Sequence, residues 1–546
     1  MNEPRHGGHL IAQVLKQEGV THLFTLSGGH IAPIYDGCVA EGIRIVDFRH
    51  EQAAGHAADG WARVTLRPGV AAVTAGPGVT DAVTGIANAL YANSPMLLLS
   101  GKNPIVEFEM GSLQEMDQVT LVSSITKWAR TCFDVRRLPD YVATALRHAM
   151  TGRKGPVFLD VPIDVQLNAV PSDVTLPRAY RTDARPLGDP DLVKRAVECI
   201  RDATRPIVFA GSGVRWAGAH EALGELAHAI KAPVFLNSLG RGCLPPDDPY
   251  FFSAARKLAL SRADVVLALG VDWDFRLGFG RKGFATPEPA VIQVDIDGAH
   301  IGRNRPVDVG IIGDPGKVIE QLVDAGVGFA QEPAWTGEVR TEEERLREEA
   351  RAGMESDAVP IHPQRFAREI RDFLDPDAVV VGDGGDIVGI SASIIQARYP
   401  GHWLDPGPFG CLGVGPSFAM AAKLAKPDKQ VLVVYGDGSF GLNAMEYESA
   451  IRQEIPFVGI IGNDGAWGQI KVAQEMLYGA GNAPASELDP EAPYHRMVEG
   501  LGGYGEKVTS PAEIGPALRR AFDAGVPACL NVMVDASLMK RASYLG

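Results

Sequence analysis

The sequence predicts an α/β protein made of three doubly wound parallel-sheet domains. Its 546 residues suffice for three or four domains at roughly 150 residues each. Short apolar runs rich in β-branched residues recur along the chain, and helical patterns lie between them. Strands that alternate with amphipathic helices are typical of parallel sheets covered by helices on both faces.

The first domain is expected within residues 1–170. Its predicted strands are THLFTLS, RIVDFR, GVAAVTAG, SPMLLLSG and GPVFLDVP, and the helical pattern EQAAGHAADGWARV follows the second. The segment Pro171–Pro190 contains several prolines and keeps no period, so it is predicted to be a linker.

The second and third domains are expected at residues 190–328 and 364–546. The predicted strands of the second are RPIVFAG, APVFLNS, ADVVLALG and AVIQVDID. Those of the third are AVVVGDGG, QVLVVYGDG, FVGIIGND and ACLNVMVD. Between the two domains, the charge-rich pattern TEEERLREEARAG predicts a solvated spacer helix. We find no short internal repeat.

The composition argues against several classes of protein. Lys and Arg total 52 against 67 Asp and Glu, and no basic run could contact phosphates, so no nucleic-acid partner is expected. The six cysteines form no CxxC pair, which argues against a zinc site or a disulfide framework. No apolar run approaches the ~20 residues of a membrane helix. The N-terminus lacks a signal-peptide core, so we expect a cytoplasmic protein without a membrane partner.

Two acidic residues follow two neighbouring apolar runs in the third domain. Asp437 lies in Gly436–Ser439, between the predicted strand QVLVVY and a helix, and Asp464 follows the strand FVGIIGN. Glycines and a helix N-terminus can hold a phosphate, but a carboxylate would repel it unless a divalent cation bridges the two. If the strands are adjacent, both acids reach one edge of the sheet. Two unrelated turns remain an equal alternative on this evidence alone.

Several longer segments carry a family resemblance. The GDG motif and the Asn463–Asp464 pair about two dozen residues later resemble a thiamine-diphosphate-binding motif, which ends in two asparagines and so usually has Asn where this chain has Asp464. Other similar segments occur in all three predicted domains: residues 49–63, 74–90, 111–130, 294–304 and 403–425. The chain therefore resembles the acetolactate synthase and 2-hydroxyacyl-CoA lyase family. The resemblance implies pyrimidine-binding, central Rossmann-like and diphosphate-binding domains.

The resemblance also implies a cofactor site. Magnesium would be bound by Asp437, Asp464 and the backbone carbonyl of Ala466. The remaining implied contacts to thiamine diphosphate are Gly385, Asp386, Ile387, Leu412, Val414, Gly438 and Ser439.

Glu51 is the expected catalytic residue. In the family a carboxylate at this position bonds the cofactor's pyrimidine and shares a proton with it, which suits a buried Glu of raised pKa. The alternative is a Glu that caps a helix beginning at Gln52. The family builds its site between two subunits, so we expect a homodimer at minimum and a tetramer as the complete assembly.

The predicted substrate side consists of residues in two loops and one further position. These are Gly29, His30, Leu113, Gln114 and Lys127. A histidine bonded within a turn is an equal alternative for His30, and a solvated surface cation is the alternative for Lys127. Tyr494 and His495 are expected only to pack.

The central domain is expected to bind ADP or CoA rather than FAD. FAGSGVRWAG is an incomplete GxGxxG, and the GMHG segment of flavin-containing synthases is absent. Candidate cations for CoA phosphates are Arg256, Lys257, Arg276, Arg281, Lys282, Lys540 and Arg541, although for each one taken alone a solvated surface charge is the favoured alternative. The tail SLMKRASYLG lies where CoA-dependent relatives have a lid.

The expected function is 2-hydroxyacyl-CoA lyase, which cleaves a 2-hydroxyacyl-CoA to formyl-CoA and an aldehyde or ketone. The alternative is acetolactate synthase, a carboligase acting on the 2-oxo acid pyruvate. A third reading is a non-catalytic nucleotide-binding relative, which the retained Glu51 and the two aspartates disfavour.

Overall fold

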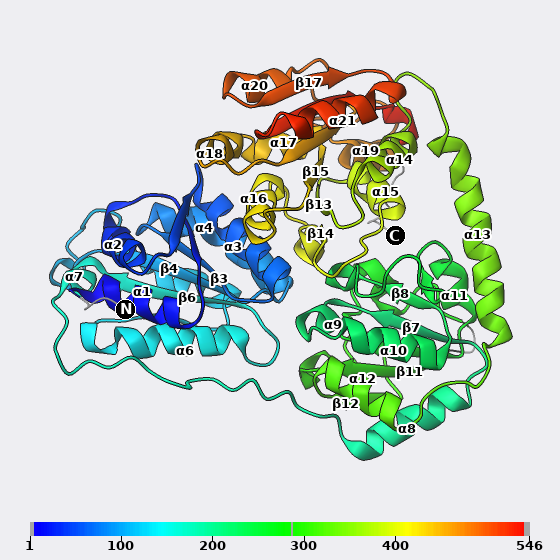
Figure 1. The fold of residues 1–546 in the computed structure, drawn as a ribbon, viewed down its shortest axis with the longest axis horizontal. Coiled ribbons are helices and arrows are strands. Elements are labelled where there is room, and N and C mark those ends of the chain that lie inside the picture. The colour runs from blue at the N-terminus through cyan, green and yellow to red at the C-terminus, as the bar shows by residue number, and fades with distance from the viewer. Residues whose placement is uncertain (1–4, 286–287, 540–546) are drawn as a thin grey trace.

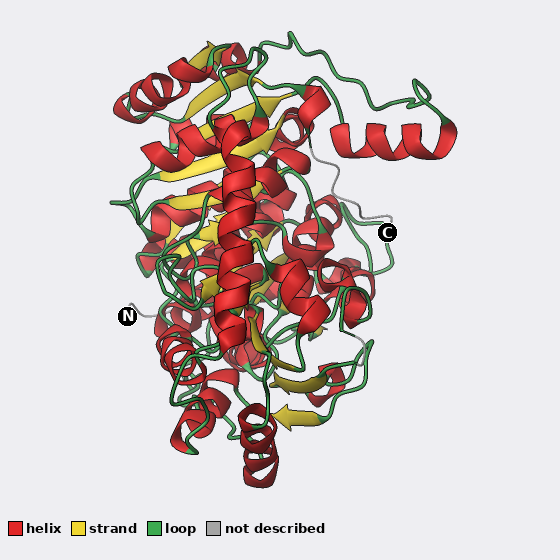
Figure 2. Ribbon diagram, turned by 90° about the vertical axis from the view of Figure 1, so that its right-hand side faces the viewer, coloured by secondary structure: helices red, strands yellow, loops and turns green. Residues whose placement is uncertain are grey.

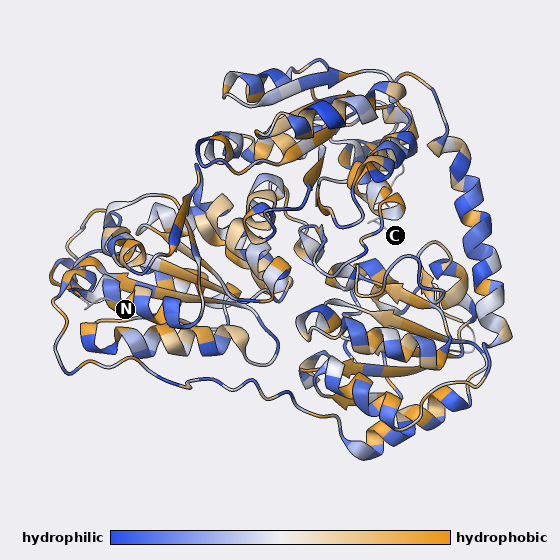
Figure 3. Ribbon diagram, viewed as in Figure 1, coloured by the Kyte–Doolittle hydropathy of each residue, from blue (hydrophilic) through white to orange (hydrophobic). Residues whose placement is uncertain are grey.

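The computed structural model of the chain describes residues 5–285 and 288–539, which form three parallel six-stranded sheets with flanking helices (Figure 1). The predicted fold class is therefore confirmed. Strands are the apolar segments and most helices have one polar face (Figure 3). No helix among the described residues is long and apolar enough to cross a membrane.

The N-terminal sheet has the strand order β2-β1-β3-β4-β6-β5. Its strands are β1 His22–Thr25, β2 Arg44–Asp47, β3 Gly69–Val73, β4 Met96–Lys102, β5 Ala129–Thr131 and β6 Pro156–Pro162. Its helices are α1 Gly7–Gln17, α2 Ala32–Ala40, α3 Glu51–Thr65, α4 Pro77–Tyr91, α5 Gln118–Val122, α6 Leu138–Met150 and α7 Ile163–Leu167. Residues 170–189 then contain no helix or strand, as the prolines predict.

The central sheet has the order β12-β11-β10-β7-β8-β9, which is the Rossmann arrangement. Its strands are β7 Pro206–Ala210, β8 Val234–Leu236, β9 Phe251–Phe252, β10 Val265–Leu269, β11 Ala290–Asp295 and β12 Val309–Ile312. Its helices are α8 Pro190–Arg201, α9 Ser212–Trp216, α10 His220–Ile230, α11 Arg256–Arg262 and α12 Pro315–Asp324.

The C-terminal sheet has the order β14-β13-β15-β16-β18-β17. Its strands are β13 Val379–Asp383, β14 Trp403–Leu404, β15 Val431–Gly436, β16 Val458–Asn463, β17 Tyr504–Val508 and β18 Ala528–Met533. Its helices are α14 Pro363–Phe373, α15 Asp386–Ile394, α16 Gly415–Ala425, α17 Asp437–Asn443, α18 Glu446–Arg452, α19 Gly468–Tyr478, α20 Tyr494–Gly500 and α21 Ile514–Asp523. Numbered from its own first strand, this order repeats that of the N-terminal sheet.

The spacer helix α13, Ala334–Met354, is only partly solvated, which corrects the prediction. It is the long helix in the foreground of Figure 2. Trp335 and Val339 are buried near its start, and Glu343 accepts backbone hydrogen bonds from Ala254 and Ala255 at 2.8 Å. The first half of α13 therefore packs against the central domain, and the second half carries exposed ion pairs.

The two terminal domains share one hydrophobic core through α3 and α16 (Figure 1). The fully buried Arg63 guanidinium lies 4.8 Å from the centre of the Phe418 ring. Its Nε and Nη2 atoms donate to the buried Asp59 carboxylate at 2.7 and 2.6 Å. A buried charge at an apolar helix interface requires such a partner.

Replacing Arg63 with Ala should destabilise the fold by about 3–5 kcal/mol, because the Asp59 carboxylate would stay buried without its cation. Urea unfolding followed by tryptophan fluorescence measures the loss. Arg67→Ala, an exposed arginine just beyond the same helix, is the control and should change stability by less than about 0.5 kcal/mol. Equal urea midpoints for the two variants would contradict the assignment.

Candidate active site

Each sheet brings two loops together where its strand order reverses. The chain runs to one side of β1, β7 and β13 and then returns to the other, so the reversals lie at β1/β3, β7/β10 and β13/β15. Ligands of open parallel sheets bind in the crevice at the carboxyl ends of such strand pairs. The predicted substrate loop, glycine-rich turn and GDG motif occupy these three places.

Two neighbouring strands of the C-terminal sheet bring the two aspartates together. β15 and β16 are adjacent and parallel, so Asp437 and Asp464 follow neighbouring strand ends. The Asp437 carboxylate accepts the backbone N–H groups of Gly438 and Gly465, both at 2.9 Å. Both aspartates therefore lie at the same edge of the sheet, which is the geometry that a shared cation site requires.

A third acid completes this cluster. Asp386 lies in the first turn of α15 and accepts a hydrogen bond from Gln469 at 3.1 Å. Burial raises the pKa of Asp437 and of Asp464, and the charge of Asp437 raises that of Asp464 further, as does Asp386. Buried oxygen ligands that repel one another are a donor set that fits Mg²⁺.

The glycine-rich loops around the cluster are tightly packed. Gly384, at φ +155°, approaches Gly436 so closely that a Cβ atom would lie 2.8 Å from its backbone nitrogen. A Cβ at Gly438 would meet the Trp467 ring at 2.6 Å. The Ser439 hydroxyl lies by the carbonyl oxygens of Asp383 and Gly436. Ile387 is buried at this position, and Gly385 is the N-cap of α15.

Asp383 is a site residue that the sequence interpretation missed. Its carboxylate accepts the N–H groups of Gly413 at 2.9 Å and Gly415 at 2.7 Å, and so holds the loop that carries Leu412 and Val414. Burial raises the pKa of Asp383 to about 7. The signal was present, because GDG occurs at residues 382–384 as well as at 436–438.

Glu51 is the first residue of α3 rather than its cap. His50 is the N-cap, and its ring nitrogen accepts the Gln52 N–H at 3.1 Å, so the capping alternative for Glu51 is wrong. The Glu51 side chain faces the β3–α4 turn, where a Cβ at Gly78 would lie 3.5 Å from Oε1. Burial, and then the charge of Asp81, raises the pKa of Glu51, which suits a group that shares a proton.

Part of the predicted substrate group comes together at the β1/β3 reversal. His30 Nδ1 lies 3.1 Å from the Thr74 hydroxyl, which donates to Gln114 at 3.2 Å. The Gln114 backbone has φ +63°, a strained value for a residue other than glycine, and Gln114 packs against Gly76. Gly29 directly precedes His30, and the Leu113 side chain is 75% exposed.

Lys127 lies elsewhere. Its ammonium group donates to the carbonyl oxygens of Thr151 at 2.8 Å and Arg153 at 2.6 Å, and burial lowers its pKa to about 8. It lines an interdomain cavity and not the His30 group. Tyr494 packs on Phe440, as expected.

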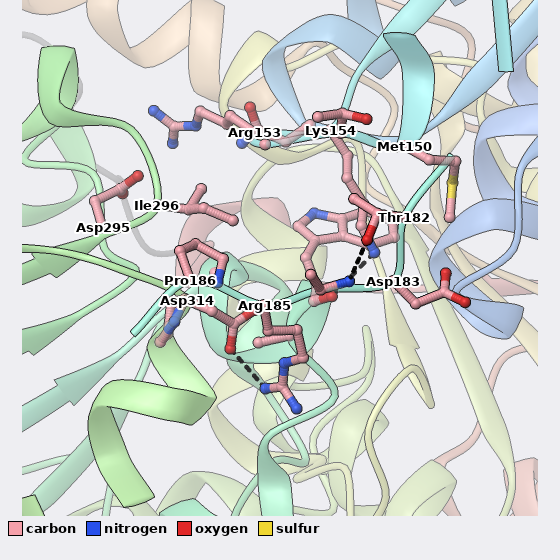
Figure 4. A pocket seen from close by; sticks show the side chains of 18 of the residues that line it. Met150, Arg153, Lys154, Thr182, Asp183, Arg185, Pro186, Asp295, Ile296 and Asp314 are labelled. Carbon is pink, nitrogen blue, oxygen red and sulfur yellow. Dashed lines mark hydrogen bonds and ion pairs between the residues drawn. The ribbon is translucent and has the colours of Figure 1, made fainter. Parts of the chain in front are cut away.

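Two cavities adjoin the reversal in the central sheet. One of about 410 Å³ lies between the central domain, the linker and the N-terminal domain, and is lined by Arg153, Lys154, Arg185, Trp216, Asp295 and Asp314 among others (Figure 4). The second, of about 520 Å³, shares Asn93, Arg153 and Lys154 with the first and adds aromatic residues.

Counting only the residues that the structure describes, the charges of the first cavity leave one cation, Lys154, without a carboxylate within 4 Å. Arg185 pairs with Asp314, and Arg153 with Asp272, both at 2.6 Å. Lys154 instead lies over the Trp216 ring and donates to its carbonyl oxygen at 3.1 Å. Burial raises the pKa of Asp295 at the end of β11. A cation, an aromatic face and a carboxyl group are what a nucleotide's phosphate, base and ribose require.

The described members of the cation set proposed from the sequence do not line this cavity, and their contact with a CoA phosphate stays a prediction. Arg276 pairs with Asp274, and Arg281 donates to the carbonyl oxygen of Asn304. Arg256, Lys257 and Lys282 are absent from both cavity walls, and Lys540 and Arg541 lie outside the described residues. Most of the tail SLMKRASYLG lies there too.

One group with metal-ligand spacing occurs away from these loops within the described ranges: His6, His9 and Asp36. Both Nε2 atoms meet one Asp36 oxygen, at 3.1 and 2.9 Å. His6 is the N-cap of α1, where the helix dipole disfavours a cation. Hydrogen bonds to the carboxylate account for this cluster.

Asp464→Asn should weaken the dependence of stability on pH in metal-free protein. Because the folded-state pKa of Asp464 is raised, this residue contributes fully to the stability of the fold below the ordinary carboxyl pKa of about 4. That contribution is lost as the pH rises through the folded-state pKa. Melting temperatures from pH 5 to 8 should therefore fall less in the variant, and its Mg²⁺ affinity should depend less on pH. Asp489→Asn, an exposed acid nearby, is the control. An unchanged pH profile in Asp464→Asn would contradict this account.

Comparison with known proteins identifies the family. Models of the thiamine pyrophosphate enzyme match at residues 5–121 (N-terminal TPP binding domain), 193–322 (central domain) and 383–532 (C-terminal TPP binding domain). A probable acetolactate synthase of Mycobacterium bovis is 42% identical over 98% of this chain and 96% of its own. The 2-hydroxyacyl-CoA lyase 2 of Bos taurus is 35% identical over 97% and 90%, and the 2-hydroxyacyl-CoA lyase of Arabidopsis thaliana 31% over 97% and 95%. The chain therefore belongs to the thiamine pyrophosphate enzyme family.

Proposed function

We propose that this protein is a thiamine-diphosphate- and Mg²⁺-dependent lyase that cleaves a 2-hydroxyacyl-CoA to formyl-CoA and an aldehyde or ketone. The observation that carries this choice is the pair of cavities that share Arg153 and Lys154. A long ligand with several phosphates, such as a CoA thioester, would use both. A small 2-oxo acid would need neither.

The residues at the two terminal reversals fit the cofactor. Asp437, Asp464 and the Ala466 carbonyl would hold Mg²⁺, and Gly438, Ser439 and the Gly385–Ile387 turn would hold the diphosphate. Residues 364–546 would form this domain, and residues 1–170 and 190–328 the pyrimidine and central domains. When bound, thiamine diphosphate supplies a carbon nucleophile.

The protein's own groups would bind and move protons around that nucleophile. Glu51, with its raised pKa, would hold a proton against the pyrimidine nitrogen. Asp383 would keep the Leu412–Val414 backbone in place beneath the ring. His30 and Gln114, bonded through Thr74, would orient the substrate's oxygens.

A second copy of the chain would complete the site. α19 begins four residues after Asp464, projects from the body of the molecule and has no buried residue (Figure 2). It exposes Met476, Leu477 and Tyr478 by 62–72%. Such an apolar surface beside the cation site fits a subunit contact, in a dimer at minimum and a tetramer as the full assembly.

Product analysis tests the proposal. Protein supplied with thiamine diphosphate and Mg²⁺ should release formyl-CoA and a carbonyl product from a 2-hydroxyacyl-CoA, and no acetolactate from pyruvate. Glu51→Gln should lower the rate by about 100-fold or more, because general acid–base groups contribute that much. Its melting temperature should stay near that of wild type. Glu225→Gln, an exposed glutamate on α10, is the control.

Acetolactate synthase is the second candidate, favoured by the 42% identity to the mycobacterial protein. Acetolactate from pyruvate at a rate comparable to that with the CoA substrate would establish it and overturn the first choice. Near-wild-type turnover in Glu51→Gln would remove the role proposed for that residue in either enzyme.

The central cavity should bind ADP or CoA without flavin. Lys154→Gln should weaken that binding by about 10-fold or more, because it removes a charge-assisted hydrogen bond to phosphate. Quenching of tryptophan fluorescence, to which Trp216 in the cavity contributes, measures the affinity. Lys194→Gln, an exposed lysine on α8, is the control. A yellow protein with flavin absorption would contradict the ligand class.

A further inference from the structure

A helix of the C-terminal domain holds the loop that leads into Glu51. Glu446, the first residue of α18, is 1% exposed. Both of its carboxylate oxygens lie 3.0 Å from the backbone nitrogen of Arg49, and its Oε2 accepts the Ser449 hydroxyl at 2.7 Å. Arg49 is two residues before Glu51, in the turn between β2 and α3.

Other contacts between these elements are more exposed. Arg452 pairs with Asp47 at 2.9 Å, with both side chains about two-fifths exposed. The Gln453 amide donates to the Asp47 carbonyl oxygen at 2.6 Å, and Arg44 donates to the Gln453 carbonyl oxygen at 3.0 Å. These contacts hold the loop between β2 and α3 against α18. Glu446 differs from them because it is buried and contacts the backbone next to Glu51.

Burying a carboxylate costs free energy, so Glu446 is an unfavourable residue for this position if its side chain only fills space. No ion pair within 4 Å involves it among the described residues, and the Arg49 side chain turns outward to Glu448 at 3.9 Å. Burial raises the pKa of Glu446 to about 7. A neutral acceptor would satisfy the Arg49 amide without burying a charge. A carboxyl group, however, places both of its oxygens at the Arg49 N–H while one of them also accepts the Ser449 hydroxyl, which suits a backbone that must be held in one place.

We propose that Glu446 is a positioning residue for Glu51. By holding the Arg49 amide, it sets the start of α3 and so the direction of the Glu51 carboxylate. α17 and α18 follow Asp437 directly, so the unit that would bind the metal also holds the proton-sharing acid of the same chain. This inference rests on the role proposed for Glu51.

Hydrogen exchange of the full chain tests it without activity. Glu446→Gln retains one acceptor oxygen but turns its NH₂ group toward the Arg49 N–H or the Ser449 hydroxyl, both of which are donors. Amide exchange in peptides covering residues 47–52 should therefore become faster by about tenfold or more. Glu454→Gln, the same change at an exposed glutamate just after α18, should leave this exchange at the wild-type rate. Glu446→Asp keeps the carboxylate but shortens its reach, and should give an intermediate rate.

Kinetics provide the second measurement. In Glu446→Gln, kcat should fall by about tenfold to 100-fold, because a small misplacement of a catalytic group costs that much. KM and the affinity for thiamine diphosphate should change by less than about threefold, since Glu446 contacts neither proposed site. Glu446→Asp should recover part of kcat, and Glu454→Gln should match wild type.

The outcomes separate this inference from the proposed function. Wild-type exchange at residues 47–52 in Glu446→Gln would overturn the positioning role. So would equally faster exchange throughout the protein, which marks a merely structural residue. If wild type converts neither substrate, the proposed function fails, and the exchange data still decide whether Glu446 holds the loop.

Discussion

Carboxylates held by backbone amides are the constraint on which this structure depends. Asp383, Asp437 and Glu446 are almost fully buried in the C-terminal domain, and each accepts backbone N–H groups instead of pairing with a base among the described residues. An ionised acid in such surroundings is costly unless a cation or proton reaches it. Two of these acids fix loops, and the third, Asp437, is the acid for which we propose a metal. The same physics raises the pKa of Glu51 and fits it for proton exchange.

The two terminal domains are copies of one topology packed against each other. Their sheets have the same strand order, and α3 and α16 each follow the second strand of their own sheet. These equivalent helices share one core, with Arg63 over Phe418. Glu51 begins one helix, and the loop held by Asp383 leads into the other. Packing equivalent helices therefore joins the two terminal domains through one hydrophobic core.

The central domain is connected to the same helices. Arg215, in α9, donates to the carbonyl oxygens of Arg63 and Val64 at the end of α3, at 2.7 and 2.9 Å. Trp216 donates to the carbonyl oxygen of Ala92 just after α4, at 3.1 Å. α9 thus covers the carboxyl ends of the two helices whose opposite ends flank Glu51. The cavity wall that would meet a nucleotide is part of this connection.

Local pattern was enough to identify much of the molecule. Alternating strands and helices predict the three parallel sheets, and Asp437 and Asp464 are recognisable because glycine-rich turns at strand ends have a local signature. The family resemblance supplied Glu51 in the same way, from consecutive residues. Even so, the repeated topology went unseen, since two sheets can share a strand order without sharing residues.

Tertiary structure alone decided which residues meet. Asp383 contacts Gly413 and Gly415 thirty positions away, and Glu446 contacts Arg49 across almost four hundred. The cavity cations Arg153, Lys154 and Arg185 come from a loop and the linker, not from the central-domain segment that the sequence suggested. Lys127 and His30 were predicted to lie together, but the packing of the domains places Lys127 at an interdomain cavity instead. Sequence determines which elements form through short-range periodicity, whereas partners in a site depend on how whole sheets pack, and that information lies in no single segment.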